Sequence, residues 1–221
     1  MKRALIIGSS GGIGSALAAR LAADGAEVVG LSRSADGLDV TDEASIARVL
    51  GGLSGAFDVV LVATGALELG PFRPEKALKQ VSAEALAAQF ALNAMGPLLV
   101  LKHALRLMPR DRATRFAALS ARVGSIGDNG LGGWYSYRAA KAALNQLVHT
   151  AAIEVARSHP LAVVVTMHPG TVDTSLTARY RGDHAAMATD QAAGHLLGVL
   201  DRLTPADTGG FYDWQGQAVP W

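Results

Sequence analysis

Two kinds of segment alternate regularly along this chain, and few architectures accept such an alternation. Short runs of aliphatic and β-branched residues, typical of buried strands, are separated by longer stretches rich in alanine and leucine, typical of helices. We expect strands at residues 4–7, 27–31, 57–63, 115–119, 161–167 and 211–214, and helices at residues 13–23, 83–108 and 136–157. A strand, a helix and another strand in this order predict βαβ units, and therefore a parallel sheet.

The expected strands are nearly continuous apolar runs, so helices should cover both faces of the sheet. We therefore expect an α/β fold of the Rossmann type, which is a doubly wound parallel sheet with helices on both faces. The chain has 221 residues, no internal repeat and no long linker, so a single domain over residues 1–221 is expected. Residues 204–210 should form a loop before the last strand.

Charge balance and cysteine content exclude several kinds of protein. Twenty Lys and Arg residues against 19 Asp and Glu residues give a net charge of +1 without a basic cluster, which argues against a nucleic-acid partner. The chain has no cysteine, and its six histidines lack the spacing of a metal site, so no metal is expected. The apolar runs are shorter than the roughly 20 residues that cross a bilayer. We expect no membrane partner and a cytoplasmic location.

A glycine-rich loop lies between the first expected strand and the first expected helix. Its sequence is Gly8-Ser9-Ser10-Gly11-Gly12-Ile13-Gly14, which has GxxxGxG spacing. Glycines let the chain turn sharply and let a pyrophosphate approach the positive N-terminus of the helix. This context predicts a dinucleotide-binding loop with contacts from Gly8, Ser10, Gly11, Ile13 and Gly14. A tight turn without a ligand is the alternative interpretation.

The residues at the end of the second expected strand indicate which of the two nicotinamide dinucleotides, NAD or NADP, is bound. A protein that binds the ribose hydroxyls of NAD is expected to have an acid there, about 20 residues beyond the loop. This chain has Ser32 and Arg33 instead. A guanidinium can bind the 2′-phosphate of NADP through charge-assisted hydrogen bonds, and the Ser32 hydroxyl can add another. NADP(H) is therefore favoured as the cofactor, with NAD(H) as the alternative if Arg33 only ends a strand in solvent.

Tyr137 and Lys141 are four residues apart in an expected helix, so their side chains share one face. A free tyrosine has a pKa near 10, and acid/base work near neutral pH requires lowering it by roughly 3 units, or about 4 kcal/mol. A nearby ammonium and an oriented nicotinamide can supply this energy. The YxxxK spacing alone is typical of a surface pair, but together with the glycine loop it predicts an acid/base centre.

These motifs, in this order, resemble those of the short-chain dehydrogenase/reductase family, and the resemblance extends from Leu5 to Trp221. Gly124-Ser125-Ile126, residues 132–138 and the closing Val219-Pro220-Trp221 also resemble a subgroup that includes bacterial C-signal proteins and small carbonyl reductases. The resemblance implies further cofactor contacts in an adenine-contacting pair, in the segment after the strand at 57–63 and in a PG motif. These residues are Asp39, Val40, Ala63, Thr64, Gly65, Pro169, Gly170, Val172 and Thr174.

The resemblance also implies a reaction, hydride transfer between NADP(H) and the carbonyl or alcohol carbon of a small or medium-sized substrate. Tyr137 would exchange a proton with the substrate oxygen, and Lys141 would bind the ribose and lower the pKa of Tyr137. Asn93 would hold a relay water. Asn93 also lies in Asn-Ala-Met-Gly-Pro, a sequence expected to break the long helix at 83–108, so it could instead cap this break.

Two positions depart from the family pattern. The hydroxyl donor usually found after the strand at 115–119 is replaced by Ala121. Counting back from Tyr137 gives Gly124 at the family's commonest distance and Ser125 one residue later, so Ser125 is the substitute, with Ser120 as the second candidate. Loss of such a donor costs about 2.7 to 4 kcal/mol of transition-state stabilisation, so turnover could be slow. The family's Asn-Ala-Gly is replaced by Ala63-Thr64-Gly65, which retains the glycine.

Residues 175–184 correspond to the segment that forms a substrate lid in relatives, and we expect this short polar segment to be mobile. Its Arg179 and Arg181 could meet an acidic substrate or could simply be solvated. The apolar side chains of Trp134, Leu131 and Trp221 are candidates for a pocket wall or for ordinary packing.

Two expectations concern partners and function. The helix at 136–157 is rich in alanine on several faces, which favours close packing against a second subunit and hence a homodimer or homotetramer. The same alanines could reflect helix propensity alone. The alternative to an enzyme acting on a small-molecule carbonyl or alcohol is a dinucleotide-binding sensing or signalling protein with slow or no turnover.

Overall fold

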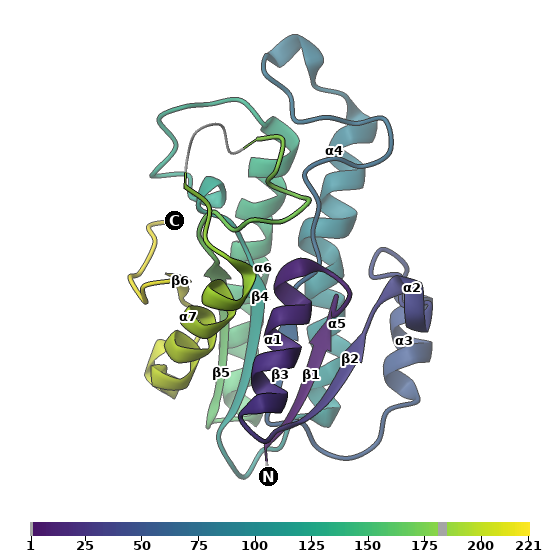
Figure 1. Cartoon of the computed structure of the whole chain (residues 1–221), viewed down its shortest axis with the longest axis vertical. Helices are drawn as coiled ribbons and strands as arrows, with labels where there is room; N and C mark the ends of the chain where they lie inside the picture. The colour runs from purple at the N-terminus through teal and green to yellow at the C-terminus, as the bar shows by residue number, and fades with distance from the viewer. Residues whose placement is uncertain (1, 181–184) are drawn as a thin grey trace.

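The computed structural model describes residues 2–180 and 185–221 and has a six-stranded parallel sheet between two layers of helices (Figure 1). The strands are β1 (Arg3–Ile7), β2 (Glu27–Leu31), β3 (Val59–Val62), β4 (Thr114–Leu119), β5 (Ala162–His168) and β6 (Phe211–Asp213). Their order across the sheet is β2-β1-β3-β4-β5-β6, and every neighbouring pair is parallel. The doubly wound parallel sheet expected from the sequence is confirmed.

Helices cover both faces of this sheet (Figure 1). One face carries α1 (Gly12–Ala23) and α7 (Thr189–Arg202), and the other carries α3 (Glu43–Gly51), α5 (Gly96–Ala104) and α6 (Tyr135–Ser158). Successive strand residues point to opposite faces, so Ile6 of β1 packs in the core under α1 and α7 while Ile7 packs in the core on the other side. Burial on both faces explains why the strands are continuous apolar runs.

The sheet order creates a crevice at one end of β1 and β3. β1 lies between β2 and β3, so the chain winds toward one edge of the sheet after β1 and toward the other edge after β3. Open α/β sheets bind ligands at the carboxyl ends of the strands at such a switch point. A Cβ atom on Gly8, just after β1, would lie 3.0 Å from the main chain of Ala63, just after β3. Only a glycine lets the two strand ends approach so closely.

The long helix expected at 83–108 is interrupted in its middle. α4 (Ala83–Phe90) continues into a π-helical turn (Ala91–Met95) that contains Asn93, then into α5 and a 3₁₀ turn (Leu105–Leu107). Pro97 lies in the first turn of α5, where its missing N–H does not disrupt the helix. The predicted break at Asn93 is confirmed in the form of a π turn.

This interrupted run, Ala83–Leu107, is also long and apolar enough to cross a membrane by length and composition alone. From the sequence we expected no segment long enough to cross a bilayer, because we considered each uninterrupted apolar run separately and not the whole helical run. In the fold, Val100, Leu101 and Ala104 of this run are core residues beneath the sheet. Packing inside the protein accounts for its apolar composition.

Two helices that follow β2 were not predicted from the sequence. α2 (Arg33–Asp36) and α3 are short, and their capping residues Ser32 and Asp42 each accept a hydrogen bond from a backbone amide of the helix. Serine and aspartate are typical capping residues, so Ser32 and Asp42 were the sequence features that could have predicted the two helix starts. Strand bounds differ from the expected ones by up to two residues, as at β3, where the strand begins at Val59 and not at residue 57.

Candidate active site

The glycine loop joins β1 to α1 at the crevice. Gly8 has a φ of 87°, and its carbonyl accepts a hydrogen bond from the Gly11 amide at 3.1 Å. A Cβ atom on Gly14 would lie 2.1 Å from the Gly8 oxygen, so the turn admits no side chain there. Among the described residues no side chain caps α1, and its first turn carries no acid. Its leading amides and the helix dipole can therefore bind an anion, and the loop fits a pyrophosphate.

The segment at 169–174, which contains the PG motif, folds back from β5 onto this loop. Gly170 has a φ of 81°, and Val172 is buried. The methyl carbon of Thr174 lies 3.0 Å from the position that a Cβ atom on Gly12 would take. The structure thus brings the PG motif and the glycine loop together, and a side chain at position 12 would press against Thr174.

The two predicted NADP contacts after β2 have different surroundings. The Ser32 side chain is buried, and its hydroxyl accepts a hydrogen bond from the Ala35 amide at 3.1 Å. The Ser32 amide donates to the Asp36 carboxylate at 2.7 Å. The Arg33 side chain is exposed and has no hydrogen bond or ion pair within the described part of the chain, whereas the Arg33 carbonyl accepts from the Gly37 amide at 3.1 Å. Arg33 therefore fits a phosphate contact, whereas the Ser32 hydroxyl is already used as a helix cap.

The predicted adenine-contacting pair lies in the turn between α2 and α3. The Thr41 hydroxyl and amide both donate to the Asp39 carboxylate, at 2.7 and 2.9 Å, and these hydrogen bonds lower the pKa of Asp39. Val40 is buried, and its carbonyl oxygen lies 2.8 Å from where a Cβ atom on Gly96 would be. The turn is held by its own hydrogen bonds and by the close approach of α5.

Ala63, Thr64 and Gly65 follow β3 and link the crevice to the side chains that are predicted to be catalytic. The Thr64 hydroxyl is enclosed and has no hydrogen-bond partner among the described residues. A Cβ atom on Gly65 would lie 2.9 Å from Asn93 Oδ1 and 3.5 Å from Lys141 Nζ. The structure therefore places two of the predicted catalytic residues directly beside Gly65.

Asn93 is fully buried in the π turn and connects the interrupted helix to the segment after β3. Its Nδ2 donates to the Ala66 carbonyl at 3.0 Å and to Gln89 Oε1 at 2.5 Å, and its Oδ1 accepts from the Ala66 amide at 3.3 Å. Both amide protons of the side chain are used by these contacts. The geometry supports the capping interpretation, and the relay-water role stays a prediction.

Tyr137 and Lys141 lie in the first two turns of α6 and are almost fully buried. Lys141 Nζ donates to the Leu119 carbonyl at 2.9 Å and lies 5.8 Å from the centre of the Tyr137 ring. Burial lowers the pKa of Lys141 to about 7. Burial also raises the pKa of Tyr137 above its usual value, so the expected lowering by Lys141 is not found. Desolvation is the cause of both shifts.

The serine candidates lie around a 3₁₀ turn, Arg122–Gly124, that packs on α6. Ala121 begins this turn. The Ser125 side chain is buried, and its hydroxyl accepts from the Asp128 amide at 3.1 Å. The Ser120 hydroxyl is enclosed and has no partner among the residues described. Among the described residues, neither serine forms a hydrogen bond with Tyr137. A hydrogen bond to Tyr137 therefore does not identify either serine as the substitute for the hydroxyl missing at Ala121.

Glu75 organises the start of α6, and the sequence analysis missed it. The Glu75 carbonyl accepts from the Trp134 amide at 2.5 Å, and its buried carboxylate accepts from the Ser136 amide at 3.2 Å and from the Ser136 hydroxyl. Trp134 has a φ of 51° and is the one non-glycine residue with a positive φ in the described chain. No motif or periodicity marks Glu75, because its partners lie about sixty positions further along the chain.

The aromatic wall expected from Trp134, Leu131 and Trp221 is not assembled. The Trp134 ring meets the Tyr137 ring edge to face, with ring centres 6.3 Å apart. Leu131 is 95% exposed, and Trp221 stacks beside Phe211 with ring centres 6.2 Å apart. Trp221 therefore has the ordinary packing that was the alternative interpretation, and Leu131 is in solvent and forms no wall.

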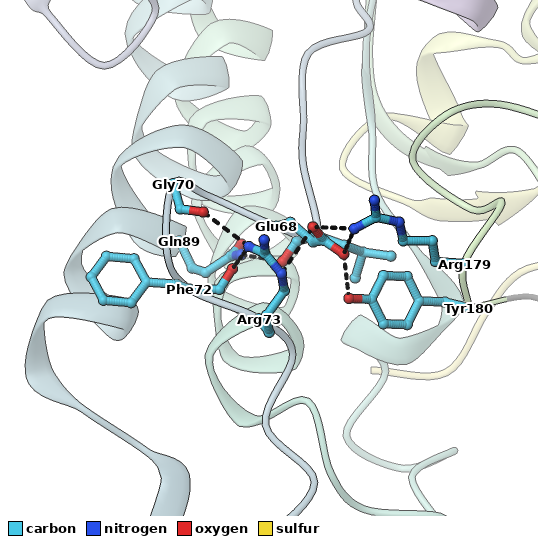
Figure 2. Close-up of polar contacts among 8 residues, drawn as sticks. Glu68, Gly70, Phe72, Arg73, Gln89, Arg179 and Tyr180 are labelled. Atoms are coloured by element: carbon cyan, nitrogen blue, oxygen red, sulfur yellow. Dashed lines mark hydrogen bonds and ion pairs between the residues drawn. The ribbon is translucent and has the colours of Figure 1, made fainter.

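A different residue, Tyr180, completes the wall. Its ring meets the Trp134 ring edge to face, with ring centres 5.6 Å apart. Its hydroxyl donates to Glu68 at 2.6 Å (Figure 2). Arg179 and Arg73 also contact the Glu68 carboxylate (Figure 2). Arg181, the second predicted lid cation, lies outside the described residues.

Comparisons with known proteins agree with this geometry. The family described as Enoyl-(Acyl carrier protein) reductase matches residues 7–211. The chain is 28% identical over 236 residues, covering 100% of both chains, to 1-hydroxy-2-glutathionyl-2-methyl-3-butene dehydrogenase of Rhodococcus sp. (strain AD45). It is 36% identical over 145 residues to C-signal of Myxococcus xanthus, covering 66% of this chain and 84% of that protein.

Among solved structures, a short-chain dehydrogenase/reductase from Burkholderia multivorans with bound NADP is similar with a TM-score of 0.80 and 25% identity. The similarity covers 100% of this chain and 99% of that one. This chain belongs to the short-chain dehydrogenase/reductase family, a family of oxidoreductases. The resemblance drawn from the sequence, including that to C-signal proteins, is confirmed.

Proposed function

We propose that this protein is an NADP(H)-preferring oxidoreductase that acts on the carbonyl or alcohol carbon of a small or medium-sized substrate, with Tyr137 as the acid/base group. The observation that carries this proposal is the meeting of three features at one end of the sheet. The glycine loop follows β1, Gly65 follows β3, and Lys141 lies beside Gly65 and Tyr137. A relative solved with bound NADP supports the choice of cofactor.

Different groups of residues would bind the different parts of the dinucleotide. Gly8, Ser10, Gly11, Ile13 and Gly14 would bind the pyrophosphate. Arg33 would bind the 2′-phosphate, and Asp39 and Val40 would contact the adenine. The nicotinamide end would face residues 63–65, Tyr137, Lys141 and the PG motif. When bound, the dinucleotide supplies or accepts the hydride.

The protonation state of Tyr137 favours the direction of reduction. Burial raises the pKa of Tyr137, so the phenol keeps its proton at neutral pH. A protonated phenol can donate a proton to the oxygen of a carbonyl group that is being reduced. The phenolate left behind would then be stabilised by the ammonium form of Lys141. Oxidation of an alcohol would require the phenolate at the start, which burial disfavours.

A second candidate function is sensing or signalling that depends on dinucleotide binding and proceeds with slow turnover. Ala121 favours this alternative, because the missing hydroxyl removes one donor to the substrate oxygen. The 36% identity to C-signal is a second point in its favour. The buried Tyr137 and Lys141 argue for the enzyme, since buried ionisable groups are costly to keep without a role.

The first experiment is a fluorescence titration of the purified protein with NADPH and with NADH. NADPH oxidation is then followed with a panel of aldehydes, ketones and diketones. We expect tighter binding of NADPH and measurable turnover of at least one carbonyl. Tighter binding of NADH would contradict the role of Arg33. Tight NADPH binding without turnover across the panel would favour the sensing alternative.

We also propose that the protein forms a homodimer or homotetramer. On α6, Ile153 is 52% exposed although it is a large apolar side chain, and the helix carries many alanines that permit close packing. Light scattering at micromolar concentration measures the mass directly. A mass of one chain at every concentration tested would contradict this proposal.

A further inference from the structure

The crevice continues beyond the proposed acid/base centre into a cleft of about 370 Å³ that carries charge on its walls. The cleft begins at Gly65, the residue beside Lys141 and Asn93, and it extends to Glu68, Arg179 and Tyr180. Ligand sites of this kind combine apolar walls with a few placed polar groups. Tyr137 and Lys141 do not line the cleft themselves, but Gly65 does and is next to Lys141, so a molecule in the cleft would lie between the proposed acid/base centre and these charged side chains.

Glu68 has a positive partner other than Arg179. Arg73 Nε lies 3.1 Å from Glu68 Oε2, and Arg73 Nη1 donates to the carbonyls of Gly70 and Phe72 at 2.9 and 3.2 Å (Figure 2). These backbone contacts hold the Arg73 guanidinium in place beside the carboxylate. The Tyr180 hydroxyl donates to Glu68 Oε1 at 2.6 Å from the opposite side. The Glu68 charge is therefore balanced by Arg73, which does not line the cleft.

Glu68, Arg73 and Arg179 carry one negative and two positive charges, so Arg179 is a cation in excess of the charge that Glu68 can balance. Its Nη1 lies 3.4 and 3.5 Å from the two Glu68 oxygens, which is at the long limit of a hydrogen bond, and its side chain is 74% exposed. Its Nε and Nη2 make no hydrogen bond to any described residue. These two nitrogens form the edge of a guanidinium that can bind a carboxylate through two parallel hydrogen bonds.

The aromatic rings connect this cation to the acid/base centre. Tyr180, the residue next to Arg179, meets Trp134 edge to face, and Trp134 meets Tyr137 in the same way. A row of three rings thus runs from the proposed proton donor to the surplus guanidinium. Such a row can bind the apolar body of a substrate.

We propose that Arg179 is a specificity-determining residue that binds a carboxylate on the carbonyl substrate, so that the protein prefers oxo acids with an apolar spacer over neutral carbonyl compounds. This inference rests on the function proposed above and adds the class of substrate. The reacting carbonyl would lie at Tyr137, the spacer along the aromatic row, and the carboxylate at the Nε–Nη2 edge of Arg179.

The test compares para-carboxybenzaldehyde with its methyl ester in the full-length protein with NADPH. The two probes share the aldehyde and the ring and differ in the negative charge. Steady-state kcat and KM are measured for the wild type, Arg179→Ala and Arg179→Lys. Arg157→Ala is the matched control, because Arg157 is exposed at the far end of α6, about 30 Å from Tyr137 along the helix.

We expect Arg179→Ala to raise KM for the acid about tenfold and to change kcat/KM for the ester less than about twofold, because only the acid loses its charged partner. Arg179→Lys should restore part of the preference, and Arg157→Ala should leave both probes unchanged. The preference of the wild type should also weaken with added salt, because Arg179 is exposed.

Three outcomes would overturn the inference while the proposed function stands. They are an equal effect of Arg179→Ala on both probes, no effect on either, and reduction of other carbonyl compounds but of neither probe. If the wild type reduces no carbonyl at all, the proposed function fails, and the inference fails with it.

Discussion

The two sides of the crevice, the one proposed to bind the dinucleotide and the one proposed to bind the substrate, are formed by different kinds of contact. On the dinucleotide side, main chain meets main chain, and a Cβ atom on Gly14 would lie only 2.1 Å from a backbone oxygen. On the substrate side, long side chains from distant segments meet, as at Glu68 and Arg179. Backbone contacts this close allow no substitution, whereas exposed side chains can be exchanged at small energetic cost. We therefore expect changes on the first side to abolish binding and changes on the second side to adjust substrate preference.

The largest effect on dinucleotide binding is expected for Gly14→Ala. The new methyl group would collide with the Gly8 carbonyl, so the loop must open and release the leading amides of α1 from their positions. NADPH affinity should fall at least about a hundredfold in a fluorescence titration, which corresponds to about 2.7 kcal/mol. Gly51→Ala is the control, because a Cβ atom at that helical position meets nothing within 4 Å. Unchanged NADPH affinity in Gly14→Ala would show that the loop does not bind the dinucleotide.

The next largest effect is expected for Ala121→Ser, which restores a hydroxyl at the start of the 3₁₀ turn. An added donor to the substrate oxygen should raise kcat by about tenfold or more, with little change in NADPH affinity. Ser125→Ala in the wild-type background is the companion variant, since the Ser125 hydroxyl already accepts from the Asp128 amide. If Ser125→Ala abolishes turnover and Ala121→Ser does not raise it, Ser125 is the donor after all.

A smaller effect is expected for Arg33→Ala. The exposed guanidinium forms no hydrogen bond or ion pair with the described residues and acts only electrostatically on Asp39, so its removal should not disturb the fold. Loss of one charge-assisted contact should weaken NADPH binding about tenfold and leave NADH binding unchanged. Titration of both dinucleotides against the variant measures the ratio. An equal loss for both would mean that Arg33 does not recognise the 2′-phosphate.

A separate prediction concerns the pH dependence of stability. Burial lowers the pKa of Lys141 to about 7, whereas an unfolded lysine has a pKa of about 10.4. Between these values the unfolded chain holds a proton that the folded chain lacks, so stability should rise as the pH rises from about 7 toward 10. Below about 7 both states are protonated, and this contribution to the pH dependence should vanish.

Lys141→Met should remove that rise, which thermal unfolding at several pH values can measure. Lys79→Met is the matched control, because Lys79 is exposed and should leave the slope as it is in the wild type. Equal slopes for the wild type and Lys141→Met would contradict the lowered pKa of Lys141.

The comparison between the two sides also explains what could be predicted from the sequence. The parallel sheet follows from the period of the apolar runs, and the glycine loop follows from spacing within seven residues. Tyr137 and Lys141 are neighbours on one helix. All these features are local in the sequence, and the structure places them where local rules predict.

Features made by distant side chains could not be predicted in this way. Glu68 and Arg179 are 111 positions apart, and Glu75 and Ser136 are 61 apart. No periodicity relates such positions. The raised pKa of Tyr137 was also missed, because it depends on the packing around the ring and not on the distance to Lys141 along the helix.

The central claim is that the backbone of one side binds the dinucleotide and that Tyr137 on the other side performs the proton transfer. The most direct test is Tyr137→Phe, studied in one cuvette by NADPH fluorescence and by NADPH oxidation with the best carbonyl of the panel. We predict NADPH affinity within about twofold of the wild type and a loss of turnover of at least about a thousandfold. Turnover near the wild-type rate would contradict the claim, as would loss of NADPH binding in a variant that unfolds at the wild-type temperature.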